Sequence, residues 1–123
     1  MTIDGYTVSP LSFEGGDIGK LSVCGSVNDL SVRGAKPLYL ALGVIAEEGF
    51  PVRELLGYME SAAAVCRSLG IELVTGDSKV VPRGQVDGLF LSTCCLGRMV
   101  REDPLGAVNL RPGDAVILTC PPG

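Results

Sequence analysis

The segment from Pro51 to Gly70 constrains the fold of this chain more than any other. Its apolar residues recur every three or four positions, which is the spacing of one face of a helix. Pro51 suits the first helical turn, and Gly70 suits the left-handed residue that ends a helix. The pattern predicts a helix over residues 52–69, with an apolar face made of Val52, Leu55, Leu56, Met59, Ala62, Ala63, Cys66 and Leu69.

A second helix is predicted over residues 19–33. Its apolar positions repeat at three-residue steps, so we expect them to form one buried stripe. Gly34 offers a left-handed cap, and Pro37 prevents the helix from continuing. The expected stripe consists of Leu21, Cys24, Val27 and Leu30.

The other apolar segments predict strands that build a sheet with these helices. The order of strands and helices is typical of an α+β fold, a mixed β-sheet with helices packed on one face. A chain of 123 residues is long enough for one core but too short for two, so residues 1–123 are expected to form a single domain. The predicted strands cover residues 2–9, 38–45, 71–75, 86–96 and 115–120.

The composition excludes several classes of function. Ten basic residues stand against fourteen acidic ones without a basic run, so the sequence does not favour nucleic-acid binding. No apolar stretch is long enough to span a membrane, and the first residues do not resemble an export signal. A cytoplasmic protein with five reduced cysteines is therefore expected. The absence of histidine excludes Ser-His and Cys-His catalytic pairs, so any metal should be a hard cation held by carboxylates.

Three polar positions could hold such a cation. Asn28 and Asp29 stand next to the predicted apolar stripe, where a carboxylate needs a cation or donors unless it belongs to the helix end. The segment Thr75–Lys79 interrupts a strand-like run and is either an ordinary turn or a site in which Asp77 binds a metal and Lys79 a phosphate. Asp4 near the start supplies a third carboxylate. The segment Gly16–Lys20 fails as a phosphate loop, because positions 14 and 21 hold Glu and Leu.

Five motifs occur together in one order and resemble a known family. They are D-x-Y-x-V-x-P from Asp4, GGDIGKL-x-x-x-G-x-x-ND from Gly15, GA-x-P-x-YL-x-x-G from Gly34, EEG from Glu47 and TGDSKVV from Thr75. This pattern resembles the HypE family of hydrogenase-maturation ATPases, which belongs to the superfamily of aminoimidazole ribonucleotide synthetase (PurM-like) and selenophosphate synthetase. The resemblance extends over residues 2–119.

The resemblance implies a PurM N-terminal-like domain that binds Mg²⁺–ATP and dimerises. Its mixed sheet would pair with that of a second subunit in a β-barrel, which leaves no free sheet edge. Asp4, Asp29 and Asp77 would be the metal ligands, and Lys79 would contact a phosphate. The full set of implied nucleotide-binding residues is Asp4, Asn28, Asp29, Gly76, Asp77 and Lys79.

The family's reaction uses ATP to dehydrate a cysteine-bound carboxamide to a thiocyanate, the source of the cyanide ligands of [NiFe] hydrogenase. The resemblance also implies contacts with the maturation proteins HypF and HypC–HypD. Compared with the family pattern, this sequence lacks an upstream glycine-rich segment, a second domain and the acceptor cysteine. We therefore expect a truncated domain that is not catalytic alone, with no residue in a catalytic role and with weak or no ATP binding. The alternatives are a stand-alone dimeric interaction module without nucleotide chemistry and a small kinase related to thiamine-monophosphate kinase.

Overall fold

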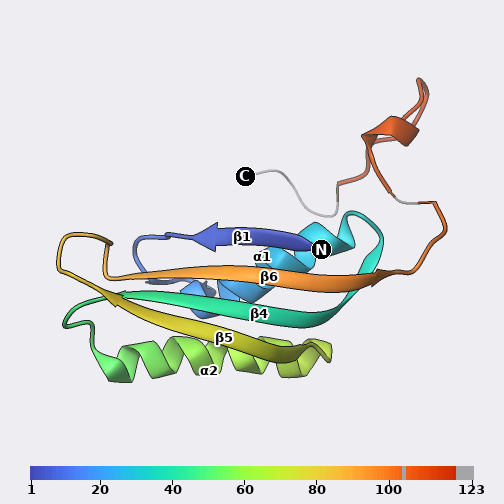
Figure 1. Ribbon diagram of the computed structural model, residues 1–123. Helices are drawn as coiled ribbons and strands as arrows, with labels where there is room; N and C mark the ends of the chain where they lie inside the picture. The colour runs from blue at the N-terminus through green and yellow to red at the C-terminus, as the bar shows by residue number, and fades with distance from the viewer. Residues whose placement is uncertain (104, 119–123) are drawn as a thin grey trace.

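A computed structural model describes residues 1–103 and 105–118 and contains one main sheet, a short hairpin and two long helices (Figure 1). The elements, in chain order, are β1 (Thr2–Tyr6), β2 (Ser12–Phe13), β3 (Gly16–Asp17), α1 (Ile18–Ser31), β4 (Ala35–Glu47), α2 (Val52–Leu69), β5 (Glu72–Val81), β6 (Leu89–Met99) and the 3₁₀ helix η1 (Ala107–Asn109). The predicted α+β class is confirmed.

The main sheet has the strand order β1-β6-β4-β5, so β1 and β5 are its two edges. β6 pairs antiparallel with both β1 and β4, whereas β4 and β5 are parallel and are joined through α2. β2 and β3 form a separate two-stranded hairpin before α1. Within the described ranges, no helix combines the length and the apolar character that crossing a membrane would require.

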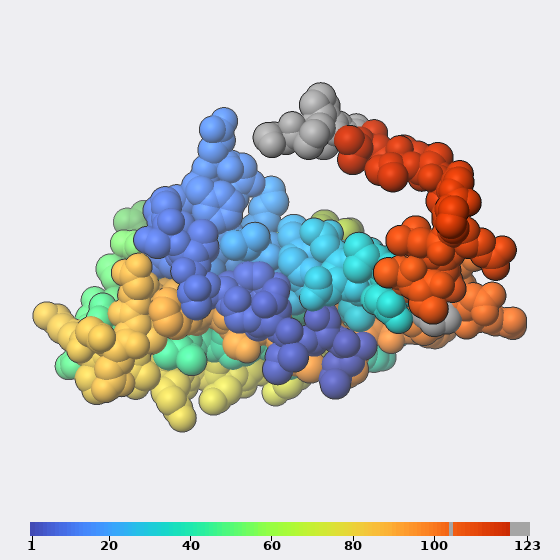
Figure 2. Space-filling view, turned by 90° about the horizontal axis from the view of Figure 1, so that it is seen from above, coloured from blue at the N-terminus to red at the C-terminus, as the bar shows by residue number. Residues whose placement is uncertain are grey.

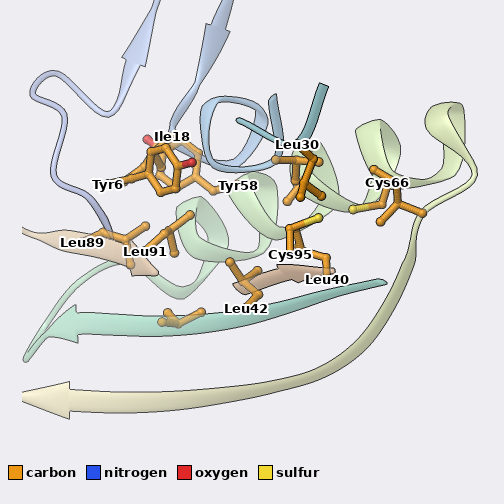
Figure 3. Close-up of a cluster of buried hydrophobic side chains, with 14 of the residues drawn as sticks. Tyr6, Ile18, Leu30, Leu40, Leu42, Tyr58, Cys66, Leu89, Leu91 and Cys95 are labelled. Atoms are coloured by element: carbon orange, nitrogen blue, oxygen red, sulfur yellow. The ribbon is translucent and has the colours of Figure 1, made fainter. Parts of the chain in front are cut away.

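The hydrophobic core lies between the sheet and the two helices (Figure 3). Alternate residues of the central strands point into it, as the period of two in a strand requires. On β4 these are Leu40, Leu42, Val44 and Ala46, and on β6 they are Leu89, Leu91, Thr93 and Cys95. The other face of the sheet, called the open face below, has no helix against it, and its residues on the three strands β1, β4 and β6 are Ile3, Gly5, Tyr39, Ala41, Gly43, Ile45, Phe90, Ser92, Cys94 and Leu96.

Helix α1 buries a different face from the predicted one. Only Leu30 of the expected stripe is buried, whereas Leu21, Cys24 and Val27 are half-buried. The buried face is made mostly of small residues: Ile18, Gly19, Ser22, Val23, Ser26 and Leu30. Small residues occupy the buried face because α1 lies in close contact with elements on two sides. A Cβ atom at Gly19 would overlap the carbonyl oxygen of Tyr58 on α2, and one at Gly25 would lie 2.5 Å from the Tyr6 hydroxyl of β1.

Helix 52–69 is confirmed at both ends, with Gly70 in the predicted left-handed conformation. The strand predicted over residues 71–75 is longer than expected, because β5 continues through Gly76–Lys79 to Val81. The interpretation of residues 75–79 as a turn is therefore wrong. The parallel neighbour β4 supplies backbone partners along this whole segment, so the glycine and polar residues stay in the ladder.

The remaining strand predictions differ mainly at their ends. β1 stops at Tyr6 instead of residue 9, and β6 covers Leu89–Met99 instead of 86–96. The strand predicted over residues 115–120 is wrong for residues 115–118, which are not in a strand, and residues 119 and 120 lie outside the described ranges. Val116 is 91% exposed and belongs to neither of the two sheets that the described residues form. An apolar, β-branched run becomes a strand only where a partner accepts its backbone hydrogen bonds.

We expect Gly19→Ala to destabilise the domain by about 2 kcal/mol or more, because the new methyl group would force α1 away from Tyr58. The matched control is Gly57→Ala in α2, where an added Cβ meets no atom within 4 Å. This control should stabilise the domain by roughly 0.5–1 kcal/mol, since alanine is the better helix former. Urea unfolding followed by circular dichroism measures both changes, and equal stabilities for the two variants would contradict the close helix contact.

Candidate functional site

Asp29 lies in the last turn of α1 and is exposed to solvent. One of its carboxylate oxygens accepts a hydrogen bond of 2.8 Å from the Thr2 hydroxyl at the start of β1. This bond joins the C-terminal end of α1 to the edge strand of the sheet. The preceding residue, Asn28, is also exposed, and its backbone carbonyl accepts the bond from Val32 that closes the helix.

The position of Asp29 is electrostatically unfavourable for the chain by itself. The C-terminal end of a helix carries partial negative charge, which disfavours an additional carboxylate by about 0.3–1 kcal/mol. No basic residue of α1 lies in that last turn to offset the charge. The exposed carboxylate of Asp29 is an oxygen ligand of the type that Mg²⁺ prefers. The end of α1 therefore suits a hard cation.

Asp4 lies on the same side of the sheet as Asp29. Thr2, Asp4 and Tyr6 alternate along β1 and therefore share the face that α1 covers, with Thr2 and Asp4 about 7 Å apart. Asp4 is exposed, and its Oδ1 atom accepts a hydrogen bond of 2.8 Å from the Gly5 backbone. β1 and α1, the elements that carry these two candidate residues, are in contact, and Figure 2 shows them side by side on this surface.

A buried group of three hydroxyls fixes how β1 and α1 lie on the sheet. Ser26 of α1 is 2.6 Å from the Thr93 hydroxyl of β6 and 3.4 Å from the Tyr6 hydroxyl of β1. Burial raises the pKa of Tyr6, the hydrogen bonds to Ser26 and Thr93 lower it in part, and nearby Asp4 raises it again. Sequence reasoning missed these residues, because single Ser, Thr and Tyr residues in apolar segments carry no motif.

Gly76, Asp77 and Lys79 lie on β5, at the opposite edge of the sheet. One cross-strand row runs from Asp77 through Gly43 and Ser92 to Gly5. Three strand spacings of about 4.8 Å therefore put roughly 14 Å between the backbones of Asp77 and Gly5. Within one chain, the predicted site residues therefore form two groups that are far apart: Asp4, Asn28 and Asp29 in one, and Gly76, Asp77 and Lys79 in the other.

The two groups also point to opposite faces of the sheet. Asp4 shares a cross-strand row with the buried residues Thr93 and Leu42, on the helix side, whereas Asp77 pairs with Gly43 of the open face. A register shift produces this orientation: Leu73 pairs with Leu40, but Thr75 pairs with Ala41, so Val74 is an extra residue. After this bulge, Thr75, Asp77 and Lys79 follow the open face.

A single cation cannot contact Asp4, Asp29 and Asp77 of one chain. Oxygen ligands lie within about 2.6 Å of a bound Ca²⁺ and closer to Mg²⁺, so their carboxylates must be neighbours. Among the described residues, no group of three or more His, Cys, Asp or Glu side chains is arranged to hold a metal ion. The chain by itself places Asp4 and Asp29 on two elements that touch, β1 and α1, and leaves Asp77 at the other edge of the sheet.

Two hollows accompany the two groups. One, of about 490 Å³, lies beside the end of α1 and is lined by residues that include Thr2, Asp29, Arg33 and Met99. The segment after β6 curves past this end of α1 (Figure 2), where Arg33 and Gly34 contact residues 105–106. The other, of about 250 Å³, lies on the open face beside Gly43, Gly76 and Asp77.

Residues 1–99 match the family described as AIR synthase related protein, N-terminal domain. This match covers the main sheet, both long helices and every predicted site residue. The match shows that the chain belongs to this family, as the PurM-like part of the motif resemblance implied.

The curated proteins and solved structures that resemble this chain include several HypE proteins. The chain is 48% identical over 119 residues to the carbamoyl dehydratase HypE of Cupriavidus necator, an alignment that covers 97% of this chain and 34% of that protein. It thus spans about a third of the length of this curated relative. A crystal structure of the hydrogenase maturation protein HypE in complex with ATP matches with a TM-score of 0.89 and 44% identity, over 91% of this chain and 33% of that one. A crystal structure of a HypE–HypF complex matches with a TM-score of 0.79 and 51% identity, over 81% of this chain and 33% of that one.

We expect Asp29→Asn to stabilise the metal-free domain by about 0.3–1 kcal/mol, because it removes a negative charge from the C-terminal end of α1. Asparagine can still accept the hydrogen bond from Thr2, so the tie to β1 is kept. The control is Asp87→Asn in the exposed loop before β6, which should change the stability little. Urea unfolding at low salt with EDTA measures the difference. A clear loss of stability in Asp29→Asn would show that the carboxylate itself stabilises the chain and needs no cation.

Proposed function

Because the chain belongs to the family of AIR synthase related proteins, as their N-terminal domain, we propose that it binds Mg²⁺–ATP and forms dimers in HypE-type hydrogenase maturation. The reaction proposed for the protein type is the ATP-dependent dehydration of a cysteine-bound carboxamide to a thiocyanate. Phosphorylation of the amide oxygen would convert a poor leaving group into a good one. The part assigned to this domain is to bind the nucleotide and to pair with a second subunit.

The observation that carries the metal proposal is the location of Asp29 at the negative end of α1, where it is hydrogen-bonded to Thr2 of β1, the strand that also carries Asp4. A divalent cation there would relieve the repulsion between the helix end and the carboxylate, and it would bridge to phosphate oxygens. Asp4 and Asp29 are proposed as its protein ligands, and Asn28 as a supporting polar contact. The relative that was crystallised with ATP supports a nucleotide as the ligand.

Gly76, Asp77 and Lys79 are proposed to contact the nucleotide from a second subunit. Within one chain these residues lie across the sheet from Asp4 and Asp29, so they can reach the same nucleotide only if another copy brings its β5 edge close. In that arrangement Asp77 would complete the carboxylate set, Lys79 would offset phosphate charge, and Gly76 would let the backbone approach.

The open face supports a dimer because it is apolar and unpartnered. Ile3, Tyr39 and Leu96 on it are 76%, 44% and 45% exposed. Its two middle rows carry mostly small side chains: one row is Gly5, Gly43 and Ser92, and the other is Ala41 and Cys94 with Ile3. The two outer rows carry large side chains, Tyr39 with Leu96 and Ile45 with Phe90. A closed barrel is narrowest at its waist, where small interior residues fit. We therefore propose that two copies join their sheets in a β-barrel with this face inside.

Partners and location follow from the same assignment. The complex of HypE with HypF supports a HypF-like protein as a partner, and HypC–HypD remain further proposed partners in a cytoplasmic pathway. The competing proposal is a dimeric interaction module that has lost nucleotide chemistry. The exposed apolar face favours pairing in both proposals, so nucleotide binding is the property that separates them.

Isothermal titration calorimetry with Mg²⁺–ATP separates the two proposals. We expect saturable binding to the wild-type chain, at least tenfold weaker binding to Asp29→Asn, and unchanged binding to the control Asp87→Asn. Removal of Mg²⁺ with EDTA should weaken wild-type binding in the same way, because the metal links the carboxylates to the phosphates. No heat at millimolar nucleotide would reject the ATP assignment and leave the interaction module.

Light scattering tests the dimer. The wild-type chain should have the mass of a dimer, and Leu96→Lys should be monomeric, because it places a charge on the apolar face that the dimer would bury. Leu56→Lys is the matched control: Leu56 is 63% exposed on α2, away from the open face, so this variant should remain dimeric. A monomeric wild type, or loss of the dimer in the control alone, contradicts the barrel arrangement.

A further inference from the structure

Two cysteine side chains from different elements meet in the core. Cys66 of α2 is 3% exposed and Cys95 of β6 is fully buried, and both belong to the same cluster of apolar residues. Figure 3 shows the two side chains pointing toward one another from α2 and from the sheet, close to Leu30 and Leu40. Both cysteines are reduced in this structure.

The electrostatics of the two thiols agree with this proximity. Burial raises the pKa of Cys66. Burial also raises the pKa of Cys95, and Cys66 raises it further, so the two groups are close enough to interact. The neighbouring Cys94 has its side chain on the open face, where it lines the hollow beside Ala41 and Asp77. Strand alternation therefore leaves Cys95 as the residue of β6 that faces Cys66.

The position of α2 gives such a pair a mechanical role. α2 contacts α1 at Gly19, and its buried residues Tyr58, Ala62 and Cys66 share the core with the residues of β4 and β6. A covalent bond from Cys66 to Cys95 would tie α2 directly to the central part of the sheet. It would also close residues 66–95 into a loop, which restricts the unfolded chain and stabilises the folded one.

We propose that Cys66 and Cys95 form a disulfide when the protein is oxidised, and that this bond pins α2 to β6. Two thiols lose two protons and two electrons to the oxidant. Hydrogen peroxide is thereby reduced to two water molecules, or oxidised glutathione to two molecules of glutathione. Because both thiols are buried and held protonated, and the thiolate is the reactive form, the reaction should be slow in the native protein. The proposal is independent of nucleotide binding and dimer formation.

The test is oxidation of the purified, fully reduced chain with oxidised glutathione, followed by alkylation in denaturant and intact mass measurement. The sequence contains five cysteines, so the expected product carries three alkyl groups instead of five and is monomeric on a non-reducing gel in SDS. The melting temperature of the oxidised protein should be higher by roughly 5–15 °C, and dithiothreitol should reverse the shift.

Variants identify the bond. Cys94→Ser should give the same two-thiol loss and the same rise in melting temperature, which assigns the bond to Cys95 despite the adjacent cysteine. Cys95→Ala should abolish the oxidation-dependent loss of two alkylatable thiols. Five alkylated thiols after prolonged oxidation of the wild type, or a bond that disappears in Cys94→Ser, would overturn the proposal. Both outcomes are read from proteins that keep Cys95, so poor folding of Cys95→Ala would not obscure them.

Discussion

The close fit of α1 between α2 and the sheet is the contact on which the other features of this structure depend. Gly19 lets the backbone of α1 approach the Tyr58 carbonyl, and Gly25 leaves room for the Tyr6 hydroxyl. The bond between Ser26 and Thr93 then satisfies buried polar groups that would otherwise be costly. Small and hydroxyl-bearing residues on one helix face thus set the depth of α1 and bring β1 alongside it.

The position of α1 in turn decides the chemistry available on each edge of the sheet. At the β1 edge, the end of α1 places Asp29 against Thr2 of the strand that carries Asp4, and the helix charge there favours a cation. At the β5 edge, Asp77 and Lys79 are set on the open face. Under the proposed function, these two groups of residues would be the two halves of a nucleotide site, and the apolar open face would bring in the second copy that completes it. Dimerisation and nucleotide binding would then depend on each other.

Much of the fold was predictable, and the errors have physical causes. Helix 52–69 was predicted to the residue, because its apolar spacing and both end signals agree. The buried face of α1 was not, because Gly19, Ser22 and Ser26 are not apolar and are buried only through the closeness of their neighbours. The segments 75–79 and 115–118 show the same dependence on neighbours. The polar segment 75–79 is part of a strand because β4 pairs with it. The apolar segment 115–118 is not a strand, because it is paired with none of the described strands.

The sequence by itself determined the helices, most strands, the family resemblance and the chemical types of the site residues: three carboxylates, one amide and one ammonium. Only the tertiary structure decided that the strand of Asp4 lies against the helix of Asp29 and that Asp77 lies at the other edge and on the other face. Alternation along a strand specifies which residues share a face but not which face the helices cover. The bulge at Val74 and the depth of α1 fix that choice, and both arise from contacts between segments distant in the chain.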